Sequence, residues 1–228
     1  MEKNLVIVNK IGDDHYIKSI NNQDYFFVSD KVKMVFDGCS SGKNSEVGVK
    51  LFSSFLSMID KEKLEKVELF EENVKKVFEK LISISNNINF IFDNLCFTIV
   101  AVFETEENFI VKYAGDGYVI AQKDNSIEYI SLEDGCENGY PKYYVYNYVE
   151  KEYLLDYKTG VKFEEKVFSK EEYQNVGVAT DGLRFAFELE FSEQNKLEEF
   201  LLLGKAGKIK ILINRNKIKF HDDITICF

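Results

Sequence analysis

Four short apolar runs, joined by tight polar turns, constrain the fold of this chain more than any other feature. The runs span 95–104, 108–115, 118–124 and 126–132, and the turns between them include TEEN and KDN. Runs of this length, bounded by polar turns, are typical of β-strands. Connections this short join antiparallel neighbours, because a parallel pair needs a crossover of a dozen or more residues. The pattern therefore predicts an antiparallel meander and argues against a regular alternation of strands and helices.

The rest of the chain contains both strand-like and helix-like patterns. We expect further strands, two of them in a tyrosine-rich stretch, at 5–8, 24–28, 32–36, 143–149, 152–156, 175–180 and 222–228. Apolar residues that recur every three or four positions predict helices at 45–59, 68–88, 182–189, 193–203 and 205–217. Asn44 or Ser45 is suited to cap the first of these helices. The combination indicates an α+β fold, and the length suits a single domain over residues 1–228.

Charge and composition restrict the partners of the chain. Its net charge is −10, which argues against nucleic acid or an anionic membrane as a partner, since both attract basic surfaces. The longest apolar window, 90–103, contains Asp93 and is too short to span a bilayer. Four cysteines occur without CxxC spacing, and the start of the chain lacks a signal-peptide pattern. We therefore expect free thiols and a cytoplasmic location.

Acidic residues recur at the ends of the apolar strands. Asp37 follows VKMVF, Asp116 follows FIVKYAG, Asp181 follows NVGVAT, and Asp222 with Asp223 precedes ITICF. The first three of these sites are Asp-Gly pairs. Strands that end at the same edge of a sheet would bring such carboxylates together, in the loops where functional groups gather.

A turn is the alternative explanation for each Asp-Gly pair, since Gly accepts a positive φ and Asp bonds the nearby backbone. Asp134-Gly135 follows no buried strand, and we interpret it as such a turn. The other acids form a set, and clustered carboxylates raise one another's pKa unless a cation neutralises them. An oxygen-rich set without His or Cys ligands favours a hard cation such as Mg²⁺ or Mn²⁺.

Six short motifs carry a resemblance to a known family. In chain order they are NNQDYFFV, VFDG with a small-residue loop, FTIVAVF, YAGDGYVIA, VATDGL and DDITICF. The series resembles the metal-dependent serine/threonine protein phosphatases of the 2C type, whose elements read roughly NED, DGxGG, TLVAAL, GDSR, SDGL and DN-x-T or DD-x-T. NQD and the loop after VFDG look most like a bacterial branch. The resemblance implies a four-layer α-β-β-α sandwich of two antiparallel sheets flanked by helices.

The resemblance also implies the ligands of two Mg²⁺ or Mn²⁺ ions. Asp37 resembles the aspartate that bridges both ions, and Gly38 would add its backbone carbonyl. Asp181 and Asp222 resemble the remaining direct ligands of the first ion. Asp116 resembles a ligand of a third, weaker ion in bacterial members. A water that bridges the pair of ions would attack phosphorus in line, so the bridging and direct ligands would be catalytic through the metals.

The chain departs from the family pattern at two binding positions. Asp24 matches the acidic residue after the family's usual Glu and is a further expected metal ligand, but the Glu itself is Gln23. A metal-bound water would therefore lose one charged acceptor. The family's phosphate-binding Arg aligns with Ser19, and the neighbouring Lys18 is the candidate replacement. A Lys makes a point contact where an Arg makes a fork.

The general acid is also altered. A His often follows the Asp-Gly pair in the family, and Cys39 stands at that position here. His15 is the candidate for the missing acid, with a plain loop histidine as its alternative interpretation. The chain has only one other histidine, His221, and shows no Ser-His-Asp triad, which fits a mechanism without a covalent nucleophile.

The resemblance implies a phosphatase that acts on phosphoserine and phosphothreonine in proteins, with a Ser/Thr kinase as a plausible functional partner. The departures from the family pattern keep a second hypothesis open, in which a catalytically weak member serves as a phosphoprotein-binding or regulatory module. A receiver domain is a third hypothesis, prompted by Asp13 and Asp14 after LVIVNKIG and by the later Asp37. Receiver domains alternate strand and helix, so the meander at 95–131 argues against it.

Overall fold

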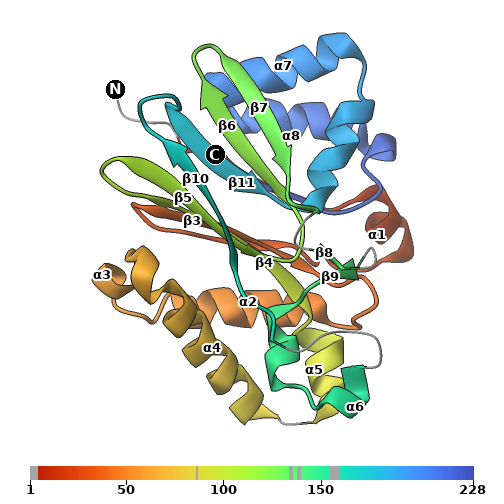
Figure 1. The fold of residues 1–228 in the computed structure, drawn as a ribbon. Helices are drawn as coiled ribbons and strands as arrows, with labels where there is room; N and C mark the ends of the chain where they lie inside the picture. The colour runs from red at the N-terminus through yellow and green to blue at the C-terminus, as the bar shows by residue number, and fades with distance from the viewer. Residues whose placement is uncertain (1–4, 86, 134–135, 138–139, 155–159) are drawn as a thin grey trace.

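Two five-stranded antiparallel sheets lie face to face, and helices cover the outer face of each sheet (Figure 1). The residues described by the computed structural model are 5–85, 87–133, 136–137, 140–154 and 160–228. The expected four-layer sandwich and its antiparallel meander are thereby confirmed. The turn expected at Asp134-Gly135 lies outside the described residues.

The first sheet joins the two ends of the chain, because its strand order is β1-β12-β11-β6-β7. Its strands are β1 (Ile7–Lys10), β6 (Tyr118–Lys123), β7 (Ser126–Ser131), β11 (Asn175–Ala179) and β12 (Ile224–Cys227). All of its pairings are antiparallel, and Ile7 lies opposite Cys227. This order places the beginning of β12 beside the end of β11, where two of the expected metal ligands lie.

The second sheet has the order β10-β5-β4-β3-β2. Its strands are β2 (Tyr25–Val28), β3 (Val32–Gly38), β4 (Phe97–Glu104), β5 (Asn108–Ala114) and β10 (Glu164–Ser169). In the pairing of β3 with β4, Asp37 lies opposite Thr98 and Gly38 lies opposite Phe97. A two-stranded hairpin of β8 (Cys136–Glu137) and β9 (Tyr140–Pro141) is separate from both sheets.

Helices pack on both sheets, as Figure 1 shows. The layer beside the second sheet holds α2 (Ser45–Leu56), α3 (Lys61–Leu64), η1 (Val67–Leu69), α4 (Phe70–Ile84) and α5 (Ile88–Asn94). The layer on the first sheet holds α7 (Phe191–Leu202) and α8 (Ala206–Arg215). The short helix α1 (Asp13–Lys18) lies where strands of both sheets end.

The core follows from the alternation of side chains along each strand. In β3, Val35 contributes to the core between the sheets together with Val100 of β4. Its neighbours Met34 and Phe36 point the other way, toward the helices. The ring of Phe36 packs edge-to-face on that of Phe52 in α2, with centroids 5.2 Å apart. Both faces of β3 are covered, so its apolar residues are buried up to the point where Asp37 emerges at its end.

All five predicted helices are present, although their ends shift by a few residues. The segment expected at 182–189 is a 3₁₀ helix, η4 (Asp181–Glu188). Asn44 occupies the N-cap position of α2, but its side chain makes no capping hydrogen bond. Sequence reasoning missed α1, α3, α5 and β10. No helix among the described residues is long and apolar enough to cross a bilayer.

The strands predicted in the tyrosine-rich stretch are wrong. Within 143–149, the segment Tyr144–Tyr148 forms a 3₁₀ helix, η3. Within 152–156, the described part belongs to α6 (Lys151–Leu154), and residues 155–156 lie outside the described residues. Alternating tyrosines favour a strand by propensity, so tertiary contacts have overridden the local preference here.

Two contacts explain the helical turn of η3. Tyr144 and Tyr148, four positions apart, both pack on Phe78 of α4, with ring centroids 5.5 and 6.0 Å from it. A strand would place these two side chains farther apart along the chain axis than one ring can cover. The side chain of Asn147 accepts a hydrogen bond from the N–H of Val161 at 2.8 Å and donates one to its carbonyl at 2.8 Å. These bonds fasten the turn to the segment that leads into β10.

Candidate metal centre

The structure brings the strand-end carboxylates of both sheets to one place. Asp37 ends β3 in the second sheet, whereas Asp181 and Asp222 flank β11 and β12 in the first. Asp116 lies in the turn between β5 and β6, and so links the two sheets. Burial raises the pKa of Asp37 well above its ordinary value, and the charges of Asp24, Asp181, Asp222 and Asp116 raise it further. The predicted acids therefore form one cluster.

The other members of the cluster also resist ionisation. Burial, followed by the charge of Asp223, raises the pKa of Asp24 well above its ordinary value. Burial, with a smaller contribution from Asp181, raises the pKa of Asp116 to about 6. Burial and the charge of Asp181 raise the pKa of Asp222 as well. Carboxylates that repel one another in this way attract a cation.

Asp223 differs from its neighbour Asp222. It is 2% exposed, and the chain itself satisfies both of its oxygens. Oδ1 accepts the N–H of Gly12 at 2.8 Å, and Oδ2 accepts the N–H of Gln23 at 2.6 Å and the ring of His15 at 2.9 Å. Asp223 therefore fastens the loop before β2 and helix α1 to the start of β12. The family resemblance named Asp222 as a ligand and gave no role to Asp223.

His15 is a buried residue of α1 and not a loop histidine. Its Nδ1 bonds Asp223, and this hydrogen bond raises the pKa of the imidazole, against the opposing effect of burial. Possible ligand atoms of His15, Asp222 and Asp223 lie within 4.8 Å of one another. The bonds already made to Asp223 leave Asp222 as the more available of the two carboxylates. The structure thus places His15 beside the cluster, on the side of α1.

Gly38 permits a close approach of the chain to the cluster. A Cβ atom at this position would lie 2.7 Å from the carbonyl oxygen of Gln23 and 2.7 Å from Oγ of Ser45. Such contacts are too short for any side chain, so only glycine fits. The side chain oxygens of Ser45 and Thr98, which flank Gly38 and Asp37, are buried without a hydrogen-bond partner among the described residues.

Sequence analysis did not identify Arg184 as a candidate site residue. Its Nη1 lies 2.9 Å from Oδ2 of Asp181, and its Nη2 lies 3.9 Å from Oδ2 of Asp222. The chain has only two arginines, so one of them places its charge between two of the clustered acids. The spacing of three residues within TDGLR is the local signal that could have found it, because it puts Arg184 and Asp181 on one face of a helical turn.

Comparison with known proteins agrees with this geometry. Residues 11–202, more than half of the chain, match the family Protein phosphatase 2C. The chain belongs to the protein phosphatase 2C family. This membership confirms the expected family and the expected phosphatase class of enzyme. No curated protein shows significant sequence similarity to the chain.

Solved structures share the fold of this phosphatase 2C chain at low sequence identity. A bacterial serine phosphatase is 16% identical, with a TM-score of 0.64 over 98% of this chain and 95% of that one. Stp1 from Staphylococcus aureus is 14% identical, with a TM-score of 0.62 over 100% and 94% of the two chains. The catalytic domain of PstP, solved in complex with two manganese ions, is 11% identical, with a TM-score of 0.57 over 98% and 95%. These likenesses show that the folds agree.

Lys18 and Gln23, at or beside positions where the chain departs from the family pattern, differ in their exposure to solvent. Lys18 is exposed at the end of α1, and its Nζ lies 3.9 Å from Oδ2 of Asp14. Gln23 is 3% exposed, and its Nε2 donates to the carbonyl of Gly42 at 3.2 Å. Its Oε1 is buried without a hydrogen-bond donor among the described residues. Gln23 therefore has a free acceptor inside the site, whereas Lys18 is on the surface.

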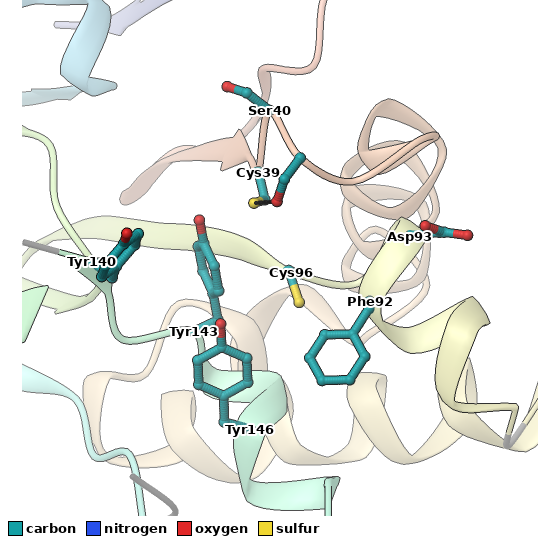
Figure 2. Close-up of a pocket in the computed structure, with 9 residues that line it drawn as sticks. Cys39, Ser40, Phe92, Asp93, Cys96, Tyr140, Tyr143 and Tyr146 are labelled. Carbon is teal, nitrogen blue, oxygen red and sulfur yellow. Dashed lines mark hydrogen bonds between the residues drawn. The ribbon is translucent and has the colours of Figure 1, made fainter. Parts of the chain in front are cut away.

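A cavity of about 350 Å³ lies next to the loop that follows Gly38 (Figure 2). Its lining residues are Cys39, Ser40, Ser41, Phe92, Asp93, Cys96, Tyr140, Tyr143 and Tyr146. In Figure 2, the hydroxyl of Tyr143 points toward Cys39. Burial raises the pKa of Tyr143, and the neighbouring Cys39 and Asp37 raise it further. Cys39 therefore lies on the wall between the carboxylate cluster and an aromatic cavity, and its Sγ bonds Oγ of Ser41 at 2.9 Å.

Proposed function

We propose that this chain hydrolyses phosphoserine and phosphothreonine in proteins, with divalent cations bound by Asp37, Asp181 and Asp222. The observation that carries the proposal is the convergence of carboxylates from both sheets around Asp37, whose pKa is raised by burial and by four neighbouring acids. Within the described part of the chain, Arg184 forms ion pairs with two members of the cluster, Asp181 and Asp222. The cluster therefore favours cations that the chain does not itself contain.

The residues present fit Mn²⁺ or Mg²⁺. All the clustered donors are oxygens, which hard cations prefer, and Gly38 follows Asp37 directly at the end of β3. Two cations would be held by Asp37, Asp181, Asp222 and the carbonyl of Gly38, with Asp24 beside them. Asp116 would hold a third cation weakly. When bound, the cations would neutralise phosphoryl oxygens and lower the pKa of a water at the site.

Residues of the chain would position the substrate and handle the proton. Asp223 fixes Nδ1 of His15, so that Nε2 is the ring atom that can donate a proton to the leaving serine or threonine oxygen. Lys18, exposed at the end of the same helix, and Arg184, half-exposed at the cluster, are the cations available to an incoming phosphoryl group. The forked guanidinium of Arg184 matches phosphate better than the ammonium of Lys18 does.

A catalytically weak member that binds phosphoproteins is the second candidate function. Two observations favour it: Gln23 offers an amide where the family has a charged Glu, and Nζ of Lys18, the candidate for the family's phosphate-binding Arg, lies 3.9 Å from Oδ2 of Asp14. Such a protein would bind cations and phosphopeptide but would turn over very slowly. Turnover, and not binding, therefore distinguishes the two functions.

The decisive experiment compares hydrolysis of p-nitrophenyl phosphate and of a phosphoserine peptide in Mn²⁺ by wild type and by Asp37→Asn. We expect metal-dependent turnover by wild type and a loss of at least about 100-fold in the variant, because one carboxylate would serve both cations. Asp124→Asn is the matched control, since Asp124 lies in an exposed turn with a positive φ that Asn also accepts. Full activity of Asp37→Asn would contradict the site, and no wild-type turnover would favour the second function.

The substrates and setting belong to the same proposal. A phosphoprotein substrate requires a kinase that phosphorylates serine or threonine, and that reaction class is the expected functional partner. All four cysteines, each within the described residues, are free, which supports a reducing compartment such as the cytoplasm. A soluble phosphoprotein substrate agrees with that location.

A further inference from the structure

One stretch of this acidic chain carries positive charges and no negative ones. Residues 200–221 contain no aspartate or glutamate, and they contain six cations: Lys205, Lys208, Lys210, Arg215, Lys217 and Lys219. The remaining residues hold 23 Lys and Arg against 39 Asp and Glu. The basic stretch is therefore a local reversal of charge, located in α8 and in the 3₁₀ helix η5 (Lys217–Lys219).

Helix α8 buries its apolar side and exposes its basic side. Ile209, Leu212 and Ile213 are at most 6% exposed and belong to the core beside the first sheet. Their neighbours Lys208 and Arg215 are exposed on the other side of the helix. Figure 1 shows α8 on the outer face of that sheet, beside α7.

The exposed cations of this stretch lack acidic partners in the part of the chain that the structure describes. Among the described residues, no ion pair involves Lys205, Lys208, Lys210, Arg215 or Lys217, which are the five exposed cations of the stretch. Glu193 of α7 contacts the stretch, but it accepts a hydrogen bond from Asn216. In α4, by contrast, lysines pair with glutamates one turn away. Unpaired like charges on one helix repel, so an anionic partner would stabilise them.

The basic stretch leads directly to the metal centre. The N–H of Asp13 in α1 bonds the carbonyl of Phe220 at 2.7 Å, and Nζ of Lys217 lies 5.2 Å from the ring centroid of Tyr16. Tyr16 is the neighbour of His15. Asp222 follows Lys217 by five positions, so their Cα atoms lie at most about 18 Å apart. An extended peptide of five or six residues can span that interval.

We propose that the exposed side of α8, together with η5, is a docking surface for an acidic segment of the phosphoprotein substrate. The proposal rests on the phosphatase function, since it places that segment close enough for the phosphorylated residue to enter the carboxylate cluster. The positive charges of α8 and η5 favour a partner segment that is rich in aspartate and glutamate. Exposed Ile211 and Ile218, 47% and 68% exposed, add apolar contacts within the basic surface.

Two other anionic partners suit the surface less well. A membrane-bound amphipathic helix buries its apolar face in lipid. In α8 that face is buried in the protein core. The remaining chain, with its large excess of acids, would be repelled by a lipid surface or by the long phosphate backbone of a nucleic acid. A short acidic peptide can contact α8 and η5 without approaching the rest of the molecule.

The test compares a phosphoserine peptide that carries six glutamates with the same peptide carrying six glycines and serines. We expect kcat/KM of wild type to be about tenfold higher for the acidic peptide, as three exposed charge contacts would give. The triple variant Lys208→Gln, Lys210→Gln and Arg215→Gln should lose this preference. Its hydrolysis of p-nitrophenyl phosphate should be unchanged, since that substrate does not reach α8.

A matched control removes the same charge elsewhere. Lys50, Lys63 and Lys66 are exposed in the helical layer of the other sheet, and their triple change to Gln should keep the preference. Equal loss in both triple variants, or no preference in wild type, would overturn the proposal. So would loss of binding to phosphatidylglycerol vesicles or to a DNA duplex by the α8 variant alone, without an effect on the acidic peptide.

Binding of the non-phosphorylated acidic peptide, measured by fluorescence anisotropy, tests docking without catalysis. If wild type binds it and the α8 variant does not, docking holds even if no substrate is hydrolysed. If no peptide and no p-nitrophenyl phosphate are hydrolysed, the phosphatase function has failed independently. Absence of binding at low salt would overturn docking whatever the enzymatic result, since a contact between exposed charges is strongest there.

Discussion

Two carboxylates, the buried Asp223 and the partly buried Asp37, lie in neighbouring regions of the site that are built in opposite ways. Around Asp223, three donors of the chain converge on the two oxygens: the backbone of Gly12, the backbone of Gln23 and the ring of His15. Around Asp37, the neighbouring groups are other acids, which raise its pKa in addition to the effect of burial. One region satisfies its negative charge internally, and the other accumulates it.

The difference is the one expected between a structural carboxylate and a proposed metal ligand. A buried charge is tolerated when hydrogen bonds compensate for its lost hydration. Asp223 meets that condition and fixes α1 against β12. Among the described residues Asp37 has no such donor, so the fold retains an unfavourable carboxylate that a proton or an external cation would neutralise. This contrast assigns opposite roles to two residues of the same type, and it can be tested by comparing their variants.

The largest expected effect is on the free energy of unfolding of the metal-free protein, which two matched variants should change in opposite directions. Asp223→Asn should lower the free energy of unfolding by about 3 kcal/mol, because it breaks a network of buried charge-assisted bonds. Asp37→Asn should raise the free energy of unfolding, because it removes a buried charge that its neighbours repel. Urea unfolding in EDTA measures both. Destabilisation of similar size in the two variants would show that the two regions are not built differently.

The second prediction concerns pH. The folded-state pKa of Asp116 is raised to about 6, and those of Asp37 and Asp24 are raised well above their ordinary values. The folded chain therefore binds more protons than the unfolded chain. This contribution to stability is complete below about pH 4 and is lost as pH rises through the folded-state values. In EDTA, Tm should fall by at least about 3 °C between pH 5 and pH 8, the effect of about 1 kcal/mol in a domain of this size.

Metal and mutation provide the controls for that pH dependence. Saturating Mn²⁺ should abolish most of the fall in Tm, because the cations would neutralise the carboxylates. Asp37→Asn should flatten the curve in EDTA. A Tm in EDTA that stays level or rises from pH 5 to pH 8 would mean that the cluster does not destabilise the metal-free protein.

The sequence predicted the residues around Asp37 better than the hydrogen bonds around Asp223. Asp37, Asp116 and Asp181 each follow an apolar strand and precede a glycine, so a local signal marks them. The role of Asp223 depends on partners about 200 residues away, Gly12 and Gln23, which no local pattern reveals. The antiparallel direction of the meander strands followed from their short turns, and the two-sheet sandwich followed from the family resemblance.

The same distinction explains the failures of prediction in the fold. The helical turn at Tyr144–Tyr148 depends on Phe78 and on Val161, which are distant in sequence from it. Local propensity favoured a strand there, and packing decided otherwise. The charge of Arg184 at the cluster depends on Asp222 as well as on its near neighbour Asp181. Sequence reasoning succeeded where the determining residues are adjacent and failed where they meet only in the folded chain.

Gln23 lies between the two regions, since its backbone bonds Asp223 and its Oε1 is a free buried acceptor. Gln23→Glu should add a charged acceptor and tighten Mn²⁺ binding by about 1–2 kcal/mol, which is the scale of a hydrogen bond to a charged group. Calorimetric titration with Mn²⁺ measures this change. Gln122→Glu, which adds the same charge at a partly exposed position of β6, should leave the affinity unaltered. Unchanged or weaker binding by Gln23→Glu would remove Gln23 from the site.

The smallest expected effect concerns Asp116, whose charge makes the smallest of the four contributions to the raised pKa of Asp37. It lies between Gly115 and Gly117, whose φ values of +92° and +138° form the tight turn from β5 to β6. If Asp116 binds a third, mostly hydrated cation, activity should rise once at low Mn²⁺ and again at high Mn²⁺. Asp116→Ala should remove the second rise and leave the first intact. If Asp116 serves only the turn, the variant should lose thermal stability, and its rate curve should superimpose on that of wild type after scaling. The titration is run well below the Tm of both proteins, so that a loss of folded protein cannot imitate a loss of metal.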